Sequence, residues 1–451
     1  MSIYGSLYTY HLNMLGLSPL HSKKHLSFSA LRKLISERVL AFDDSRQQGK
    51  VDYSLHDCCQ SAFAMMFFQD PSINAFQERL QEIRQLNNLK TLFNVTAIPQ
   101  STQLRTAIDD IPSTEIELLF SDFYRPLQRG KQLKNFEFID GKYLIPLDGV
   151  QYFSSNKISC DCCLTKTTNK TTTYYHQVVA ATIVCPGIKQ VIPLAPEPIQ
   201  NTDGSTKQDC EINAGKRIVK KIRATHPKLK IIIAGDGLYS KQPFIDQLKE
   251  NRMSFILVAK PTDHKLLYQW FSEFHQMGET QKLEIGDLKG RRHLYEWSND
   301  IPLNGTKDAD NVNYFEYTIF KGDKVNYHNS WVTDITITED NIIELVKGGR
   351  ARWKIENEAF NTLKNQGYHL AHNFGHGDKH LSYNLLLFNF LAFCMHQIFE
   401  LSDIVYQKCR AKFTSRKEYW NQLRCTIRIL IFPSFESLLK FIIDPEGGIP
   451  P

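Results

Sequence analysis

Residues 229–261 read LKIIIAGDGLYSKQPFIDQLKENRMSFILVAKP, and their pattern indicates the fold class of the chain. Its first six residues, LKIIIA, form a short apolar run rich in β-branched side chains, which predicts a buried strand. SFILVAKP predicts a second strand for the same reason, and PFIDQLKENR between them has the pattern of a helix. A strand, a helix and a strand in this order are typical of an α/β sheet with helices packed on its faces.

The segments before this stretch add three strands and a helix. We predict strands at Tyr143–Val150 (YLIPLDGV), Tyr175–Val184 and Gln190–Leu194, followed by a long amphipathic helix, KQDCEINAGKRIVKKIRATH. The full order is three strands, helix, strand, helix, strand, which favours a mixed sheet flanked by helices. We assign residues 139–274 to the first part of this α/β core.

Residues 1–138 have the periodicity of helices, and we predict a helical N-terminal domain that binds DNA. Within it, LKTLFNVTAIPQSTQLRTAI predicts two helices joined by a turn that contains Pro99. If these helices form a helix-turn-helix, the exposed first turn of the second helix presents Gln103 and Arg105 to DNA. Two packed helices without any role in DNA binding have the same pattern.

The part of the chain after residue 274 divides into three regions. Residues 275–337 contain β-rich runs between turn-rich segments, which predicts an all-β insertion. Residues 338–400 are expected to complete the core, and their most apolar window, Leu385–Met395, is too short and too polar to span a bilayer, so we expect a core helix. Residues 401–451 are basic and helical, which suits dimerisation or DNA binding.

The composition is that of a globular protein, with 42% hydrophobic and 23% charged residues in a chain of 451. The 54 Lys and Arg only slightly exceed the 48 Asp and Glu, but several basic residues are clustered, as in KRIVKKIR, which favours an acidic polymer as partner. The start, MSIYGSLYTYHLNMLGL, lacks the features of a signal peptide, so we expect a cytosolic protein. In a reducing compartment the ten cysteines are expected to be thiols or metal ligands.

Two aspartates follow apolar runs of the predicted sheet. Asp148 ends the first strand in LDGV, and Asp236 comes just past the fourth in GDGLY. Ligand sites on open α/β sheets gather at strand ends. Each aspartate precedes a glycine, which lets a metal or substrate approach closely. The alternative is an Asp-Gly pair that only starts a turn.

A third carboxylate lies on the predicted helix RARWKIENEAFNTLK, residues 350–364. At about 100° per residue, Arg352 and Glu356 fall within an apolar arc, whereas Glu358 points to the opposite side. Glu356 is therefore either part of a half-buried ion pair with Arg352 or a carboxylate that faces a catalytic centre. The apolar arc consists of Trp353, Ile355, Ala359, Phe360 and Leu363.

The three carboxylates have a shared chemical meaning. Mg²⁺ prefers oxygen ligands and takes one or two carboxylates. Two such ions that share a central Asp polarise a phosphate, activate a water or a 3′-hydroxyl, and stabilise the leaving oxygen. Asp148, Asp236 and Glu356 together therefore predict phosphoryl transfer on a nucleic-acid backbone.

Asp148 in LDGV, Asp236 in GDGLY and Glu356 in RWKIENEAF resemble the Asp-Asp-Glu (DDE) triad of the transposases of bacterial insertion sequences. The resemblance implies a ribonuclease H-like core. One branch of these transposases holds a β-rich insertion between the second and third acids, which is where residues 275–337 lie.

That branch has a helix signature of Tyr, two residues, Arg, three residues, Glu, six residues, Lys. Arg352 and Glu356 match it, but Gly349 stands at the Tyr position and Lys364 comes one residue late. The resemblance implies that Arg352 and Lys364 contact DNA.

The implied activity is a metal-dependent DNA transposase that cleaves phosphodiesters at the element ends and joins the 3′-OH to target DNA. Asp148, Asp236 and Glu356 would be catalytic and would hold two Mg²⁺ or Mn²⁺ ions. The partners would be double-stranded DNA of the terminal inverted repeats and of the target, bound by a homodimer in the bacterial cytoplasm, at the nucleoid. The alternatives are a catalytically silent or domesticated DNA-binding protein and a stand-alone ribonuclease H-like nuclease.

A second group of residues suggests a structural zinc site. Cys160, Cys163 and His176 have suitable spacing, but the sequence shows no obvious fourth ligand, and buried thiols are the alternative. Cys185 and Cys210 are candidates for that ligand. The histidines of HLAHNFGHGDKH are instead interpreted as polar loop residues that touch DNA; they are His369, His372, His376 and His380.

Three further residues lie near the acidic motifs. Glu211 is explained by its place at a helix start, where an acidic side chain favours the helix dipole, and it becomes an auxiliary acid if that helix begins near Asp148. Tyr239 and Trp353 are the nearest aromatic residues. For both we favour core packing over stacking on a terminal base.

Overall fold

The computed structural model describes residues 24–446 except 45, 47, 48, 50, 81, 82 and 201–207. The N-terminal segment that argued against a signal peptide lies outside these residues. The chain divides into two compact units. The helical unit comprises Met1–Lys131, Asn365–His369 and Gly377–Pro451, and the sheet unit comprises Gln132–Lys364 and Leu370–His376.

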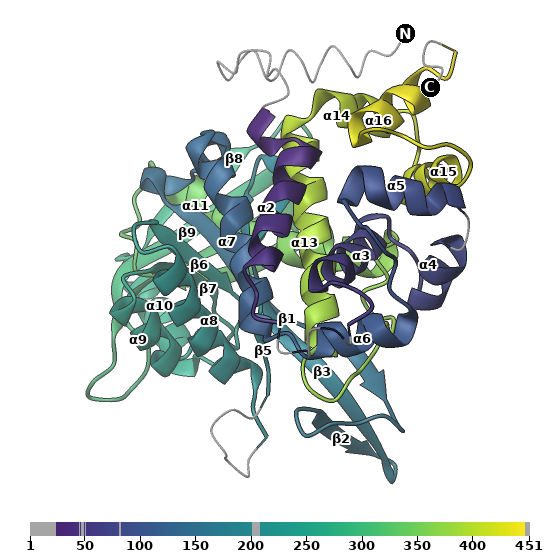
Figure 1. Ribbon diagram of the computed structural model, residues 1–451. Coiled ribbons are helices and arrows are strands. Elements are labelled where there is room, and N and C mark those ends of the chain that lie inside the picture. Colours follow the sequence, from purple (N-terminus) through teal and green to yellow (C-terminus); the bar gives the residue numbers. More distant parts are fainter. Residues whose placement is uncertain are drawn as a thin grey trace. The chain divides into compact units, whose positions relative to one another are not determined.

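The sheet unit is an α/β structure built on one mixed sheet (Figure 1). The order of its strands is β2-β3-β1-β6-β7-β11-β10-β9-β8, and β4 and β5 also pair with β3. The strands are β1 (Tyr143–Ser155), β2 (Leu164–Thr168), β3 (Thr171–Cys185), β4 (Ile188–Pro193), β5 (Glu197–Pro198), β6 (Ile231–Gly235), β7 (Ser254–Val258), β8 (Gln281–Gly286), β9 (Arg291–Pro302), β10 (Asn311–Lys321) and β11 (Lys324–Thr333).

The centre of the sheet has the mixed character that the strand and helix order predicts. β1 is antiparallel to β3 and parallel to β6, and β6 is parallel to β7. All five residues of β6 are buried, which agrees with the continuous apolar run LKIIIA. The α/β class with helices on a mixed sheet is therefore confirmed.

Helices pack on this sheet, and a further helical segment of the same unit carries Glu356. α8 packs on β3, and α9 and α11 pack on β7. Each buries one apolar stripe; in α8 it contains Ile218, Val219 and Ile222. The helices of this unit are α8 (Glu211–Thr225), α9 (Gln242–Glu250), α10 (Lys265–Met277), α11 (Ile342–Ala351), the π-helical turn η4 (Ile355–Phe360), α12 (Asn361–Asn365), and the short 3₁₀ helices η2 (Gln132–Phe136) and η3 (Ile139–Gly141).

The predicted β-rich insertion consists of β8 to β11, which form consecutive antiparallel pairs. These strands extend the main sheet, because β11 pairs antiparallel with β7 through Trp331↔Val258 and its neighbours. Pairing with β11 protects the edge that β7 would otherwise expose.

Residues 164–175, which are rich in Thr and Lys, form a β-hairpin. β2 pairs with the first part of β3 from Leu164↔Tyr175 to Thr168↔Thr171. Asn169 and Lys170 both have positive φ, 48° and 63°, as a two-residue type I′ turn requires. The turn chemistry is unusual because Lys170 holds a position that glycine normally takes.

The helical unit is built around α13 (Figure 1). α3, α6 and α7 pack directly against it, and α2 packs on α3 and α7. Its members are η1 (Lys24–Leu26), α2 (Phe28–Leu40), α3 (Leu55–Phe67), α4 (Ile73–Leu80), α5 (Ile83–Phe93), α6 (Ser101–Asp109), α7 (Ser113–Arg129), α13 (Leu381–Ser402), α14 (Ile404–Arg410), α15 (Arg416–Ile429) and α16 (Phe435–Ile443).

α13 is long and apolar enough to cross a membrane, but 89% of its most apolar window is buried inside the protein. The core helix expected around Leu385–Met395 is therefore confirmed. Its asparagines have specific partners: Asn384 donates to the carbonyls of Ile108 and Ile111, each at 2.8 Å, and Asn389 donates to that of Tyr368 at 2.7 Å. These bonds explain how amides are tolerated in so apolar a helix.

The segment 338–400, predicted as the second part of the α/β core, is shared between the two units. The sheet unit holds it up to Lys364 and again at Leu370–His376, whereas residues 377–400 belong to the helical unit together with α14, α15 and α16.

Candidate functional site

Asp148 and Asp236 are at equivalent positions on neighbouring parallel strands. The last register pair between β1 and β6 is Pro146↔Ala234, and each aspartate comes two residues later. Neighbouring strands lie about 4.8 Å apart, so the two acids are at the same level of the sheet. Contrary to expectation, β1 does not end at Asp148, because its pairing with β3 continues to Ser155. The pairing of β1 with β6 stops just before the aspartates, and β6 ends at Gly235.

The surroundings of Asp148 concentrate negative charge. Burial raises the pKa of this carboxyl to about 7, and the charges of Glu356 and Glu211 act in the same direction. The positive charge of Arg352 and a bond from the backbone N–H of Gly149 (2.9 Å) oppose the shift. A half-buried carboxylate among other acids favours a bound cation.

Glu356 lies on η4, which packs against β1 and β4. Nη1 of Arg352 donates to Oε1 of Glu356 at 2.6 Å and lies 3.7 Å from Oδ2 of Asp148. The ion pair that the helix pattern suggested is present, and it also involves Asp148. The charge of Glu358 instead acts on Lys354, whose ammonium donates to the carbonyl of Ile188 at 2.8 Å.

The apolar arc of the Glu356 helix is only partly as predicted. Ile355, Ala359, Phe360 and Leu363 are buried, but the side chain of Trp353 is 63% exposed. The prediction that Trp353 packs in the core is therefore wrong. An angle of 100° per residue places it incorrectly because the helix is not regular: a turn at Arg352 and the π-helical η4 interrupt it.

The π-helical turn η4 helps to explain why Lys364 comes one residue later than the Lys of the helix signature. The N–H of Asn361 bonds to the carbonyl of Glu356, five residues earlier. Such a turn holds one residue more than an α-helical turn. In the helix signature the Lys is the seventh residue after Glu, whereas Lys364 is the eighth. The extra residue in the π-helical turn rotates the side chain of Lys364 towards the direction that the seventh residue would have in a regular α-helix. Its side chain is exposed.

Glu211 is a fourth acid beside Asp148. It is the first residue of α8, accepts from the hydroxyl of Tyr239 at 3.0 Å, and has a raised pKa because of burial. A Cβ at Gly149 would collide with its carboxylate, so glycine is required there for the approach of Glu211. Tyr239 is fully buried, which confirms its role in the core. The sequence placed Glu211 only at a helix start, because the closeness of α8 to β1 is a tertiary feature.

Lys260 is a further residue near this site that the sequence did not single out. It follows the end of β7, and its aliphatic stem covers Gly237, where an added Cβ would lie 3.2 Å from it. Gly237 is the neighbour of Asp236. The rule that ligand sites gather at strand ends would have found Lys260 had it been applied to β7.

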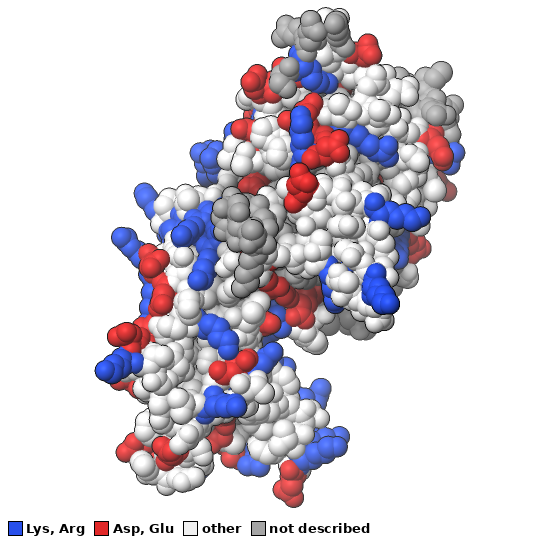
Figure 2. All heavy atoms as spheres, turned by 90° about the horizontal axis from the view of Figure 1, so that it is seen from below, with Lys and Arg blue, Asp and Glu red and all other residues white. Residues whose placement is uncertain are grey.

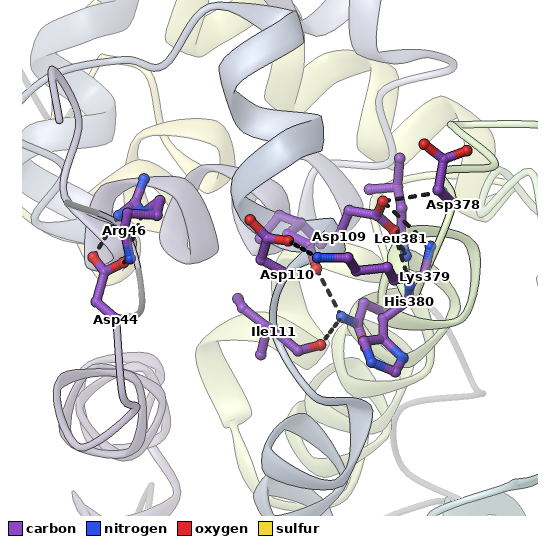
Figure 3. Close-up of polar contacts among 11 residues, drawn as sticks. Asp44, Arg46, Asp109, Asp110, Ile111, Asp378, Lys379, His380 and Leu381 are labelled. Carbon is purple, nitrogen blue, oxygen red and sulfur yellow. Dashed lines mark hydrogen bonds and ion pairs between the residues drawn. The ribbon is translucent and has the colours of Figure 1, made fainter. Parts of the chain in front are cut away.

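The predicted helix-turn-helix residues lie on α5, α6 and the segment between them, and both helices are present. Gln103 is exposed and donates to Asp52 at 3.3 Å, whereas Arg105 is half-buried. The C-terminal end of α6 has a structural role, because the carboxylate of Asp109 accepts four successive backbone N–H groups at the start of α13 (Figure 3). The donors are those of Asp378, Lys379, His380 and Leu381.

Charge on the face shown in Figure 2 is mixed: Lys and Arg side chains are interspersed with Asp and Glu. Lys and Arg side chains do not form a single continuous patch on this face. Charge alone therefore does not mark a DNA-binding surface there.

Cys160, Cys163 and His176 come together as the sequence suggested, and the fourth member of the group is His376. His376 lies outside helices and strands, as expected for a loop residue, and its imidazole is part of this group. Cys185 and Cys210 do not belong to the group. Among the other histidines, the ring of His372 packs on Phe374 with centroids 4.8 Å apart, and His380 precedes α13.

No protein-family model matches the chain, and no curated protein matches it.

Proposed function

We propose that the chain is a metal-dependent DNA transposase with the catalytic triad Asp148, Asp236 and Glu356. The observation that carries this proposal is the equivalent placement of Asp148 on β1 and of Asp236 just after β6, with Glu356 joined to Asp148 through Arg352. Separated by 88 and 120 positions in the chain, these residues have no shared local structural reason to meet.

The sheet topology supports a ribonuclease H-like core. β4, β3 and β1 form an antiparallel series, and β6 and β7 follow on the other side of β1 in parallel. α8 connects the first series to β6, and α9 connects β6 to β7. The three acids lie on β1, after β6 and on the helix that follows the all-β insertion, in the order that the resemblance to DDE transposases implies.

The donor set fits divalent magnesium or manganese. The carboxylates of Asp148, Asp236 and Glu356 are hard oxygen ligands. Burial, and after it the charges of Glu356 and Glu211, raise the pKa of Asp148, and a bound cation would stabilise its ionised form. When bound, two such ions supply Lewis acidity for an in-line displacement at phosphorus.

The other residues of the site suit a DNA end. Arg352 holds Glu356 and Asp148 in place and can exchange these contacts for a phosphate, which its planar guanidinium binds well. Lys364 and Lys260 are exposed lysines that suit backbone contacts. Trp353, exposed one residue from Arg352, is placed to stack on an unpaired terminal base. Gln103 of α6 is a further candidate for contacts to duplex DNA, as is Arg105.

We further propose that the protein acts on double-stranded DNA of its terminal inverted repeats and of the target as a homodimer, in the bacterial cytoplasm. The experiment is to incubate the full chain and Mg²⁺ with duplexes that carry the DNA flanking its gene, and with a plasmid target. Joined products support a transposase. Cleavage without joining would indicate a stand-alone nuclease, and binding without either would indicate a silent DNA-binding protein.

A further inference from the structure

We propose that Cys160, Cys163, His176 and His376 form a structural zinc site. The two sulfurs and two imidazole nitrogens all lie within 4.8 Å of one another. They come from three separate segments: the connection between β1 and β2, strand β3, and the segment 370–376 that follows α12. All four belong to the sheet unit.

Five of the six distances between these atoms are close to those of a tetrahedron around zinc, and the ligand atoms of the sixth pair, Cys160 and His376, lie within 4.8 Å of each other. Zn–S bonds of about 2.3 Å and Zn–N bonds of about 2.05 Å require edges of about 3.8 Å for S–S, about 3.6 Å for S–N and about 3.3 Å for N–N. The Sγ atoms of Cys160 and Cys163 are 3.8 Å apart. Nε2 of His176 lies 3.7 Å and 3.5 Å from them, respectively. Nε2 of His376 lies 3.5 Å from Sγ of Cys163 and 3.1 Å from Nε2 of His176.

The local backbone suits a pair of thiolate ligands. Cys160 and Cys163 are linked by a tight turn in which the N–H of Cys163 donates to the carbonyl of Cys160 at 3.0 Å. The N–H of Cys160 points back at Sγ of Cys163, 3.5 Å away. A backbone N–H aimed at a ligand sulfur stabilises its negative charge and orients it.

The two histidines are held by aromatic packing. Tyr152 stacks on His176 with the ring planes 16° apart, and Phe153 contacts both imidazoles. The two imidazoles are themselves nearly parallel, with centroids 5.1 Å apart. Ring orientation is therefore set before any metal binds, which lowers the entropic cost of binding.

Four protein ligands close the coordination shell, so the site is structural rather than catalytic. Its position shows what it would stabilise. His176 of β3 pairs with Phe153 of β1, at the base of the β2–β3 hairpin. β1 and β3 also hold the pair Asp148↔Ala180, which lies four residues further along β3, about 13 Å away. Zinc would thus tie the base of the hairpin to the chain that follows the Glu356 helix, without touching the acidic site.

The test is the metal content of the full-length protein, measured by inductively coupled plasma mass spectrometry after purification without chelator. We expect about one zinc per chain in the wild type, and a loss of at least about tenfold in zinc affinity in Cys160→Ser, Cys163→Ser and His376→Asn. His376→Cys should keep zinc, because three thiolates and one imidazole are also a zinc ligand set. The matched controls, which keep zinc, are Cys162→Ser, between the two cysteine ligands, and His372→Asn, in the same segment as His376.

A second measurement uses only the wild-type chain, so it tests the site even if the variants do not fold. The wild-type chain, produced in cobalt-supplemented cells, should show the intense visible bands of tetrahedral Co²⁺ and a thiolate charge-transfer band in the near ultraviolet. A metal-free wild type, equal loss of zinc in Cys162→Ser, or an intact mass lower by two hydrogens from a Cys160–Cys163 disulfide would overturn the proposal. Asp148→Asn should retain full zinc, so failure of the transposase assignment leaves this test unaffected.

Discussion

Arg352 and Glu356 form an ion pair of 2.6 Å, and the same nitrogen of Arg352 lies 3.7 Å from the carboxylate of Asp148. One guanidinium thus serves two acids of the proposed triad, from β1 and from the helix after the insertion. It holds Glu356 towards the sheet and lowers the pKa that burial imposes on Asp148. This dual contact makes Arg352 a positioning residue as well as a candidate phosphate ligand.

Substituting Arg352 should therefore shift the pH dependence of DNA cleavage. Arg352→Gln removes the charge that opposes the raised pKa of Asp148, so the midpoint of the acidic limb should move up by about one pH unit. Cleavage rates in Mg²⁺ from pH 6 to pH 9 provide the measurement. Lys347→Gln, which removes an exposed positive charge from α11, should leave the midpoint in place. An unchanged midpoint in Arg352→Gln would contradict the coupling.

Affinity for divalent metal should fall on the acid side of neutrality. Because the pKa of Asp148 is about 7, protons compete with metal for this carboxylate below that pH. Between pH 8 and pH 6 the affinity for Mn²⁺ should decrease about tenfold, which electron paramagnetic resonance of free Mn²⁺ can follow. In Asp148→Asn the remaining affinity should be weak and less dependent on pH. Equal affinity of the wild type at pH 6 and pH 8 would show that Asp148 is not a ligand.

Asp148 should also lower the stability of the metal-free protein at alkaline pH. Its folded pKa lies above its unfolded value, so the folded state binds more protons, and the free energy of unfolding decreases as pH rises from about 4 to about 7. Asp148→Asn should raise the free energy of unfolding at pH 8 by about 2 kcal/mol, measured by denaturant titration without metal. Asp323→Asn, at an exposed turn, should have no effect. A destabilised Asp148→Asn protein would contradict this reasoning.

In the helical unit, Asp109 should act as a remote cap of α13. Its carboxylate accepts four backbone N–H groups at 2.7–3.1 Å, so Asp109→Ala should cost about 2–4 kcal/mol of the free energy of unfolding. Burial raises the pKa of Asp109, but the four bonds together lower it below its ordinary value. The contribution is therefore present above about pH 4 and lost as the pH falls further. Asp110→Asn, which breaks only a surface pair with Lys379, should cost less than about 1 kcal/mol. Equal effects of the two variants would argue against capping.

The sequence predicts the individual helices and strands better than the tertiary contacts between them. The buried run LKIIIA and the acids after apolar runs were readable because strand patterns and strand-end sites are local signals. Pairing of β11 with β7 was not readable, since it joins residues far apart in the chain. The sequence does not predict His376 as a fourth ligand for the same reason, since 200 positions separate it from His176. It predicts a buried Trp353 because a regular angle per residue takes no account of a π-helical turn.

Strand transfer by single-residue variants tests the central claim most directly. Asp148→Asn, Asp236→Asn and Glu356→Gln preserve side-chain size but remove a carboxylate, and each should reduce joining of the flanking DNA to target by at least about a hundredfold. Glu358→Gln, on the same helix but with a charge that acts on Lys354, should stay within about threefold of the wild type. Loss in the three variants and retention in the control is the predicted result. Joining at wild-type rates in any one of the three would contradict the triad.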